Sequence, residues 1–303
     1  MDHADSIYEA TEQPRYNELN PRVSKAQNQV TEIFASLPAQ ARVLDLGARH
    51  GSFKVERQDV LVVRVDLEAF PAHESAAIVQ ADAARLPFAS GTFDLVIANH
   101  SLEHFEELGQ ALAEIGRVRT RQALLCITVP DASTLTDRIY RWLGRGGGHV
   151  NAFTSAPALA RQIEDATGMA HLGTKPLFSS LAFLNRRNIA TARPMRMVLF
   201  LGGSEHFLVL LNYVFRLLDR ALGTRLSLYG WCSFFGVARA PVPLEAWTNV
   251  CVRCGAGHPE ASLGPRVQRR WLIFTVYACP LCGAVNLLAH DSWARRSVTG
   301  AER

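Results

Sequence analysis

The chain has little of several features that mark specialised classes of protein. Its formal net charge is only +4, which neither requires nor excludes an anionic partner. The first thirty residues carry five acidic side chains and lack the apolar core of a secretory signal. The apolar run over residues 197–215 is broken by Gly202, Gly203 and Glu205, so it is a poor candidate for a membrane-spanning helix. We therefore expect a cytoplasmic location, with membrane association as the alternative.

Cysteine is scarce as well, and its placement is uneven. Four of the six cysteines form two C-x-x-C pairs, Cys251 with Cys254 and Cys279 with Cys282, and a glycine follows each pair. In a reducing compartment such pairs are typical of metal ligands rather than disulfides. Four thiolates complete a tetrahedral zinc site that has no open position for catalysis. The pairs therefore predict a structural zinc-ribbon-like module over residues 246–292, which would lack an adequate core without the metal.

Short apolar segments alternate with helical patterns through most of the chain. This alternation predicts an α/β fold, with a Rossmann-like seven-stranded sheet covered by helices on both faces. We expect an N-terminal helical cap over residues 1–40, a main domain over 41–240 and a helical insert over about 180–222. The expected strands are residues 43–46, 60–65, 78–82, 93–98, 121–129, 169–177 and 226–238, and the expected helices after the fourth and fifth strands are residues 102–118 and 155–167.

The first expected strand leads into a glycine turn. Gly47 and Gly51 bracket this turn, and a helix predicted from Phe53 would direct unpaired N–H groups toward a ligand. Asp66 ends the second strand, close to the roughly twenty-residue offset at which nucleotide-binding units place an acid on ribose hydroxyls. An NAD-binding domain is the alternative, but the spacing G-x-x-x-G differs from its G-x-G-x-x-G pattern.

In order, these segments resemble the class I S-adenosylmethionine-dependent methyltransferases, notably the small-molecule subgroup. The resemblance covers about residues 40–175 with a return at 226–240, and it rests on Asp45-Leu-Gly-Ala-Arg-His-Gly51, Asp66, Ala81-Asp82, Leu86-Pro-Phe88 and Phe93-Asp-Leu-Val-Ile-Ala-Asn-His-Ser-Leu-Glu-His104. One position departs from the family pattern, because Arg49 stands where a third glycine is usual.

The resemblance implies S-adenosylmethionine as the cofactor and a role for each matching position. Asp45 and Gly47 would line the methionine part, Asp66 would bind the ribose, and Asp82 with Ala83 would flank the adenine. Asn99 and His100 would edge the sulfonium region. The full implied set of cofactor-binding residues is Asp45, Gly47, Ala48, Gly51, Asp66, Leu67, Asp82, Ala83, Asn99 and His100.

Three histidines are the candidate catalytic residues on the acceptor side: His149, His104 and His100. Methyl transfer from a sulfonium needs in-line positioning, and it needs a base only where the nucleophile carries a proton. His149 follows three glycines and precedes a predicted helix, and similar segments occur in the resembled subgroup. It is the best single acceptor-side candidate, and a loop-fixing role is the alternative.

The leading functional hypothesis is methyl transfer to a small-molecule or glycan- or lipid-linked acceptor. The insert over residues 180–222 would roof the acceptor pocket, lie on a membrane surface or form a dimer face. One alternative is an RNA methyltransferase that docks its substrate through the zinc module. Nucleic acid is not favoured, because Asn99-His-Ser-Leu stands where base-amine enzymes carry an Asn-Pro-Pro-Tyr-like segment. A non-catalytic scaffold is a further alternative, and Arg49 alone supports it.

Overall fold

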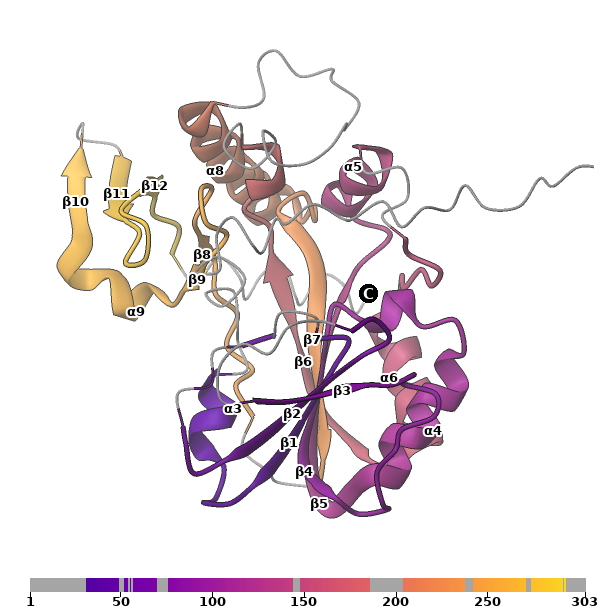
Figure 1. Cartoon of the computed structure of the whole chain (residues 1–303). Helices are drawn as coiled ribbons and strands as arrows, with labels where there is room; N and C mark the ends of the chain where they lie inside the picture. The colour runs from indigo at the N-terminus through magenta and orange to yellow at the C-terminus, as the bar shows by residue number, and fades with distance from the viewer. Residues whose placement is uncertain are drawn as a thin grey trace, which may run out of the picture.

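Short segments rich in valine, leucine and isoleucine form the central sheet of the computed structural model (Figure 1). The structure describes residues 31–48, 52–53, 55, 57–69, 76–143, 148–185, 204–237, 242–270, 274–290 and 292. Seven strands lie in the order β3-β2-β1-β4-β5-β7-β6; β1 to β5 are parallel, and β7 runs antiparallel to both β5 and β6. This arrangement confirms the predicted α/β fold. The strands are β1 Arg42–Leu46, β2 Leu61–Asp66, β3 Ala76–Gln80, β4 Phe93–Asn99, β5 Arg119–Pro130, β6 Ala170–Phe178 and β7 Leu228–Gly236.

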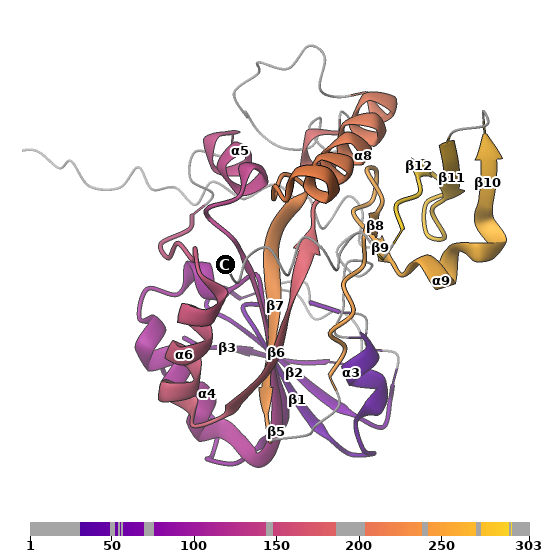
Figure 2. The ribbon, with the colours of Figure 1, turned by 180° about the vertical axis from the view of Figure 1, so that it is seen from behind.

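Side chains on the two faces of the sheet enter two separate cores, because successive residues of a strand point to opposite faces. Val43 packs in one core with Ile33 of helix α3, whereas its neighbour Leu44 packs in the other core with residues of α4 and α6. Figures 1 and 2 show α3 against one face of the sheet and α4 with α6 against the other. These helices are α3 Thr31–Ser36, α4 Leu108–Val118 and α6 Ala156–Thr167.

Two predicted helices differ from the structure. After β1, none of the described residues 52, 53, 55 and 57–60 is helical, so they do not form the helix predicted from Phe53. The helix predicted over residues 102–118 is divided into η1 (Leu102–His104) and α4, because Phe105 between them is extended, with φ −79° and ψ 114°. This interruption lies directly after His104, one of the predicted acceptor-side residues.

Three further elements lie beyond the carboxyl ends of the central strands (Figure 1): α5 (Leu135–Leu143), η2 (Ala182–Leu184) and α8 (Glu205–Leu222). Helix α8 belongs to the predicted insert, of which residues 186–203 lie outside the described part. Within the described residues, none of the helices combines the length and apolarity that crossing a membrane requires.

The residues after 242 form a small module with two sheets. β8 (Asn249–Val250) pairs with β9 (Gly257–His258), and a second, antiparallel sheet has the order β10-β11-β12. Its strands are β10 Val267–Arg270, β11 Phe274–Ala278 and β12 Val285–Leu287, and α9 (Glu260–Leu263) and η3 (Gly264–Arg266) precede them.

This module packs against α8, and both views show the two side by side (Figures 1 and 2). Arg253 donates two hydrogen bonds, of 2.7 and 2.6 Å, to the carboxylate of Glu205 at the start of α8. The ring of Tyr213 meets the ring of Phe274 edge-on, with centroids 6.0 Å apart. Helix α8 therefore joins the C-terminal module to the end of the sheet at which the parallel central strands finish.

Candidate cofactor and acceptor sites

The end of β1 comes very close to the segment that follows β4, and Gly47 is the point of closest approach. Gly47 has φ +63°, and a Cβ added to it would lie 2.5 Å from the Cβ of Ser101. Carbon atoms in contact lie about 3.5–4 Å apart, so any side chain at residue 47 would force one segment to move. Glycine at this position is therefore required by both the backbone conformation and the packing.

Asp45 lies buried in β1 just before this turn. Its Oδ2 accepts a hydrogen bond of 2.9 Å from Ser52 N and lies 3.7 Å from Arg64 Nε. Burial raises the pKa of Asp45 to about 6, although the Ser52 hydrogen bonds and the charge of Arg64 act in the opposite direction. Among the described residues, the buried Oδ1 has no hydrogen-bond partner.

The next strand ends bring further predicted cofactor residues to the same edge. The N–H groups of Gly47 and Ala48 donate to the carbonyl of Val65 at 2.8 and 3.3 Å, and Ala81 N donates to the carbonyl of Asp66 at 3.0 Å. These bonds hold the residues after β1, β2 and β3 beside one another.

The side chains at this edge differ in character. Asp66 and Asp82 each accept a hydrogen bond from the backbone N–H two residues ahead, at 3.2 and 2.9 Å. Between them in sequence, the side chain of Leu67 is 69% exposed. Ala83, next to Asp82, is half-buried. The edge thus offers carboxylates for hydroxyl groups and an apolar surface for a flat ring.

Asn99 ends β4, and His100 turns the chain out of the sheet. His100 has φ +54°, a conformation that is uncommon for residues other than glycine and recurs at functional sites. Its backbone N–H donates to the carbonyl of Thr128 at 2.9 Å. Its ring stacks on Tyr229 with centroids 5.6 Å apart, and its Nε2 lies 3.3 Å from the Tyr229 hydroxyl. Burial raises the pKa of Tyr229, so the phenol stays neutral.

The structure brings His104 and His149 together, although 44 residues separate them in sequence. Their rings meet edge-on with centroids 4.9 Å apart. Tyr140 of α5 stacks on the other side of His149, at 6.0 Å. Burial lowers the pKa of His149 to about 4, although the charge of Glu103 acts to raise it. The imidazole of His149 is therefore neutral at pH 7.

Glu103 completes this group and is the residue that sequence reasoning missed. Its side chain is 1% exposed. Burial opposes its ionisation, but the hydrogen bond and charge of His100, 3.6 Å away, outweigh burial and hold its pKa below the usual range. The sequence places Glu103 in the Leu-Glu-His segment at 102–104, of which only His104 was proposed as a functional residue. Gly51 and Arg49, also named from the sequence, lie outside the described residues.

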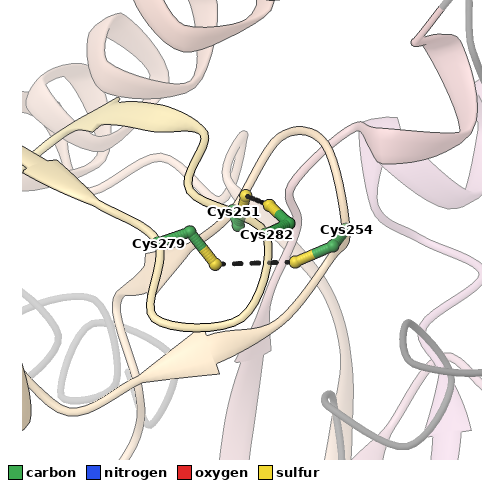
Figure 3. A group of neighbouring side chains, drawn as sticks. All are labelled: Cys251, Cys254, Cys279 and Cys282. Carbon is green, nitrogen blue, oxygen red and sulfur yellow. Dashed lines mark hydrogen bonds between the residues drawn. The ribbon is translucent and has the colours of Figure 1, made fainter.

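The four paired cysteines form a second site, in the C-terminal module (Figure 3). All four sulfur atoms lie within 4.8 Å of one another. The two pairs are folded alike: Cys251 and Cys279 each donate from their N–H to the carbonyl five residues ahead at 2.9 Å, and the following glycines have φ +73° and +71°. Converging thiols on two matching turns fit one tetrahedral metal ion.

Comparison with known proteins agrees with the fold and the order of these motifs. Residues 44–127 match the family described as methyltransferase domain. Over these residues the chain is therefore similar to a methyltransferase domain, in agreement with the predicted class I fold. This match spans β1 to the body of β5 and so includes the turn at Gly47 and the segment through His104.

Two similar proteins are both named malonyl-[acyl-carrier protein] O-methyltransferase. The protein from Legionella pneumophila is 31% identical over 152 residues, which cover 44% of this chain and 53% of that protein. The protein from Enterobacter lignolyticus is 30% identical over 171 residues, which cover 53% of this chain and 66% of that protein. This chain thus spans less than two thirds of the length of either relative. The YcgJ protein from Bacillus subtilis, at 18% identity and TM-score 0.45, aligns over 70% of this chain and 97% of its own.

Proposed function

We propose that this chain is an S-adenosylmethionine-dependent methyltransferase that transfers a methyl group to an oxygen atom of a small-molecule or carrier-linked acceptor. The observation that carries the proposal is the edge formed by the ends of β1, β2 and β3, where hydrogen bonds hold Gly47, Asp66 and Ala81 side by side. The family match and the names of the two relatives support the reaction type.

Each part of the cofactor has a chemically suitable group at this edge. The buried Oδ1 of Asp45, which has no hydrogen-bond partner among the described residues, suits the ammonium of the methionine part, because a buried carboxylate oxygen without a partner is costly. Asp66 suits the ribose hydroxyls, and exposed Leu67 suits one face of the adenine. Glycine at residue 47 lets the backbone approach the ligand closely.

The acceptor side suits positioning better than general-base catalysis. A carboxylate acceptor has no proton to lose at neutral pH, so in-line placement against the sulfonium is sufficient. His149, with a pKa of about 4, is a weak proton acceptor. We therefore propose that His100, His104 and His149 orient the acceptor oxygen.

Calorimetric titration with S-adenosylmethionine tests the cofactor site. Asp66→Ala should weaken binding at least about tenfold, because it removes the acceptor of the ribose hydroxyl bonds. Asp165→Ala, which changes an exposed carboxylate of α6, is the matched control and should bind as the wild type does. Absence of binding by the wild type would refute the proposal and favour the non-catalytic scaffold. Transfer of labelled methyl to malonyl-loaded acyl carrier protein then tests the acceptor.

We also propose that Cys251, Cys254, Cys279 and Cys282 bind a structural zinc ion. The site has two supporting side chains: His258 Nε2 lies 3.4 Å from the Cys279 sulfur, and Asn286 Nδ2 donates to the Cys251 sulfur at 3.5 Å. Metal analysis should find about one zinc fewer per chain in Cys279→Ser than in the wild type. Equal zinc content in the two proteins would exclude the site.

A glycan- or lipid-linked acceptor, and peripheral membrane contact through residues 180–222, stay predictions. The supporting observation is a row of exposed apolar side chains on α8, namely Phe207, Leu210, Val214 and Leu217. Co-sedimentation with anionic vesicles tests the contact, and protein that remains in the supernatant would dismiss it. The RNA methyltransferase alternative requires the zinc module to bind RNA, which a filter-binding titration measures.

A further inference from the structure

Glu103, His104 and His149 form a compact group of potential metal ligands outside the cysteine site. Each residue offers one ligand atom, and the three atoms lie within 4.8 Å of one another. Ligand atoms at about 2.0–2.2 Å from a common ion lie about 3–3.5 Å apart, so small side-chain adjustments would bring all three onto one cation.

Hydrogen bonds to backbone carbonyls hold the two segments that carry these residues against each other. Val150 N and Asn151 N both donate to the carbonyl of Glu103, at 2.8 and 3.0 Å. The Asn151 side chain also donates to the carbonyls of Leu102 and Phe105, at 3.0 and 2.7 Å. Three residues in and beside η1, Leu102, Glu103 and Phe105, are thus tied to the segment that carries His149, and the ligand atoms converge as a result.

The hydrogen bonding of His104 prepares it as a ligand. Its Nδ1 lies 3.0 Å from the carbonyl oxygen of Gly148. Because a carbonyl oxygen only accepts, Nδ1 carries the proton and Nε2 keeps its lone pair. Histidines that bind metals usually donate their other ring N–H in this way to a carbonyl or a carboxylate, which fixes the tautomer and the ring orientation.

The other two residues each have a buried polar atom without a hydrogen-bond partner among the described residues. Oε2 of Glu103 and Nδ1 of His149 are inaccessible, and within the described part of the chain neither has a hydrogen-bond partner. Buried polar atoms are nearly always paired, and a buried carboxylate needs a positive partner in particular. His100 Nδ1 lies 3.6 Å from Oε1, the other oxygen of Glu103, and therefore does not serve as the partner of Oε2.

We propose that Glu103, His104 and His149 bind one divalent cation of the first transition series, and that this cation holds an oxygen of the acceptor. The site is separate from the cysteine site. Two imidazoles and one carboxylate suit ions such as Mn²⁺, Fe²⁺ and Zn²⁺ and leave coordination positions open. The role of the ion rests on the proposed function, whereas its binding does not. An acceptor carboxylate bound to the ion would have no proton to release. Its oxygen would then form the bond to the methyl carbon as the carbon–sulfur bond breaks, and the bonding electrons would stay on sulfur.

Manganese binding to the full-length, zinc-containing protein tests the inference. Mn²⁺ is the probe, because thiolates bind it poorly and its free form is measured directly by electron paramagnetic resonance. The wild type should bind one Mn²⁺ per chain with neither S-adenosylmethionine nor acceptor present. Glu103→Gln and His149→Ala should each weaken binding at least about tenfold. His206→Ala, which changes an exposed histidine of α8, is the matched control and should bind as the wild type does.

The outcomes separate this inference from the proposed function. S-adenosylmethionine affinity, measured on the same samples, reports whether each variant is folded. Full cofactor binding with no bound Mn²⁺ in the wild type would overturn the cation site and leave the methyltransferase proposal intact. Bound Mn²⁺ without cofactor binding would support the cation site and refute the methyltransferase proposal. Equal Mn²⁺ binding by Glu103→Gln, His149→Ala and the wild type would also overturn the assignment. Should Glu103→Gln fail to fold, His149→Ala alone decides the outcome.

Discussion

Gly47→Ala is the substitution whose cost follows most directly from the structure. Two terms add at this position. An L-residue held at φ +63° is strained by about 1–2 kcal/mol. The new Cβ would also lie 2.5 Å from the Cβ of Ser101, so one segment must move by about 1 Å in a packed site. Overpacking of this kind costs about 1–3 kcal/mol, which gives a total of about 2–5 kcal/mol.

Gly91→Ala is the matched control, because it isolates the backbone strain of an L-residue at positive φ. Gly91 has φ +69°, and a Cβ added to it meets nothing within 4 Å. Urea denaturation should therefore show that Gly47→Ala is less stable than Gly91→Ala by about 1–3 kcal/mol. The affinity of Gly47→Ala for S-adenosylmethionine should also fall at least about tenfold, because the movement occurs at the proposed cofactor edge, formed by the ends of β1, β2 and β3.

Removing the obstructing atom is the second half of this test. In the double variant Gly47→Ala/Ser101→Gly the Cβ of residue 101 is absent, so the steric term should disappear and the backbone term remain. The two substitutions should consequently be non-additive in a double-mutant cycle. Equal stability of Gly47→Ala and Gly91→Ala, or simple additivity in the cycle, would refute the reasoning.

Three further predictions follow from particular groups. Asp45→Asn should stabilise the cofactor-free protein at pH 7 by up to about 3 kcal/mol, while weakening S-adenosylmethionine binding, because the folded-state pKa of about 6 lies above the unfolded value of 3.8. Since the folded carboxyl keeps its proton longer, wild-type stability should fall as the pH rises from about 4 to 6, and urea titrations of Asp45→Asn should lack this fall. Asn151→Ala should cost about 1–3 kcal/mol in urea denaturation, because two partly buried hydrogen bonds to carbonyls, of 3.0 and 2.7 Å, are lost; an unchanged midpoint would contradict this. Chelation of zinc, or Cys279→Ser, should lower hydrogen-exchange protection in the module and in α8 but leave the sheet protected; uniform protection would show that the module does not support α8.

Local sequence patterns were sufficient for most of the fold. Strand residues alternate between two cores, as Val43 and Leu44 do, and this period of two is visible in the sequence. Ser155 caps α6 by accepting from Ala158 N at 3.3 Å, and Gly168 ends it with φ +67°, so both ends of that helix were readable. The helix predicted after Gly51 was wrong, because a glycine and an apolar residue do not reveal whether a connection is helical.

The predicted cofactor residues and the two cysteine pairs could be proposed from the sequence because each belongs to a short local motif. The turn at Gly47 and the acids after the second and third strands follow the order of the strands, and parallel strands place their carboxyl ends at one edge. Each cysteine pair is a local turn with its own glycine.

The acceptor side depended on the tertiary structure. The sequence by itself determined the order of the strands along the chain and the glycine turn at residue 47, because both follow from local patterns, whereas the predicted cofactor residues came from the family resemblance. Only the fold decided that His149 lies against His104 and Glu103, since that meeting depends on the bonds from residues 150 and 151 to a segment more than 40 residues away. The same holds for Asp45, whose raised pKa comes from burial, a property that the sequence around it does not state.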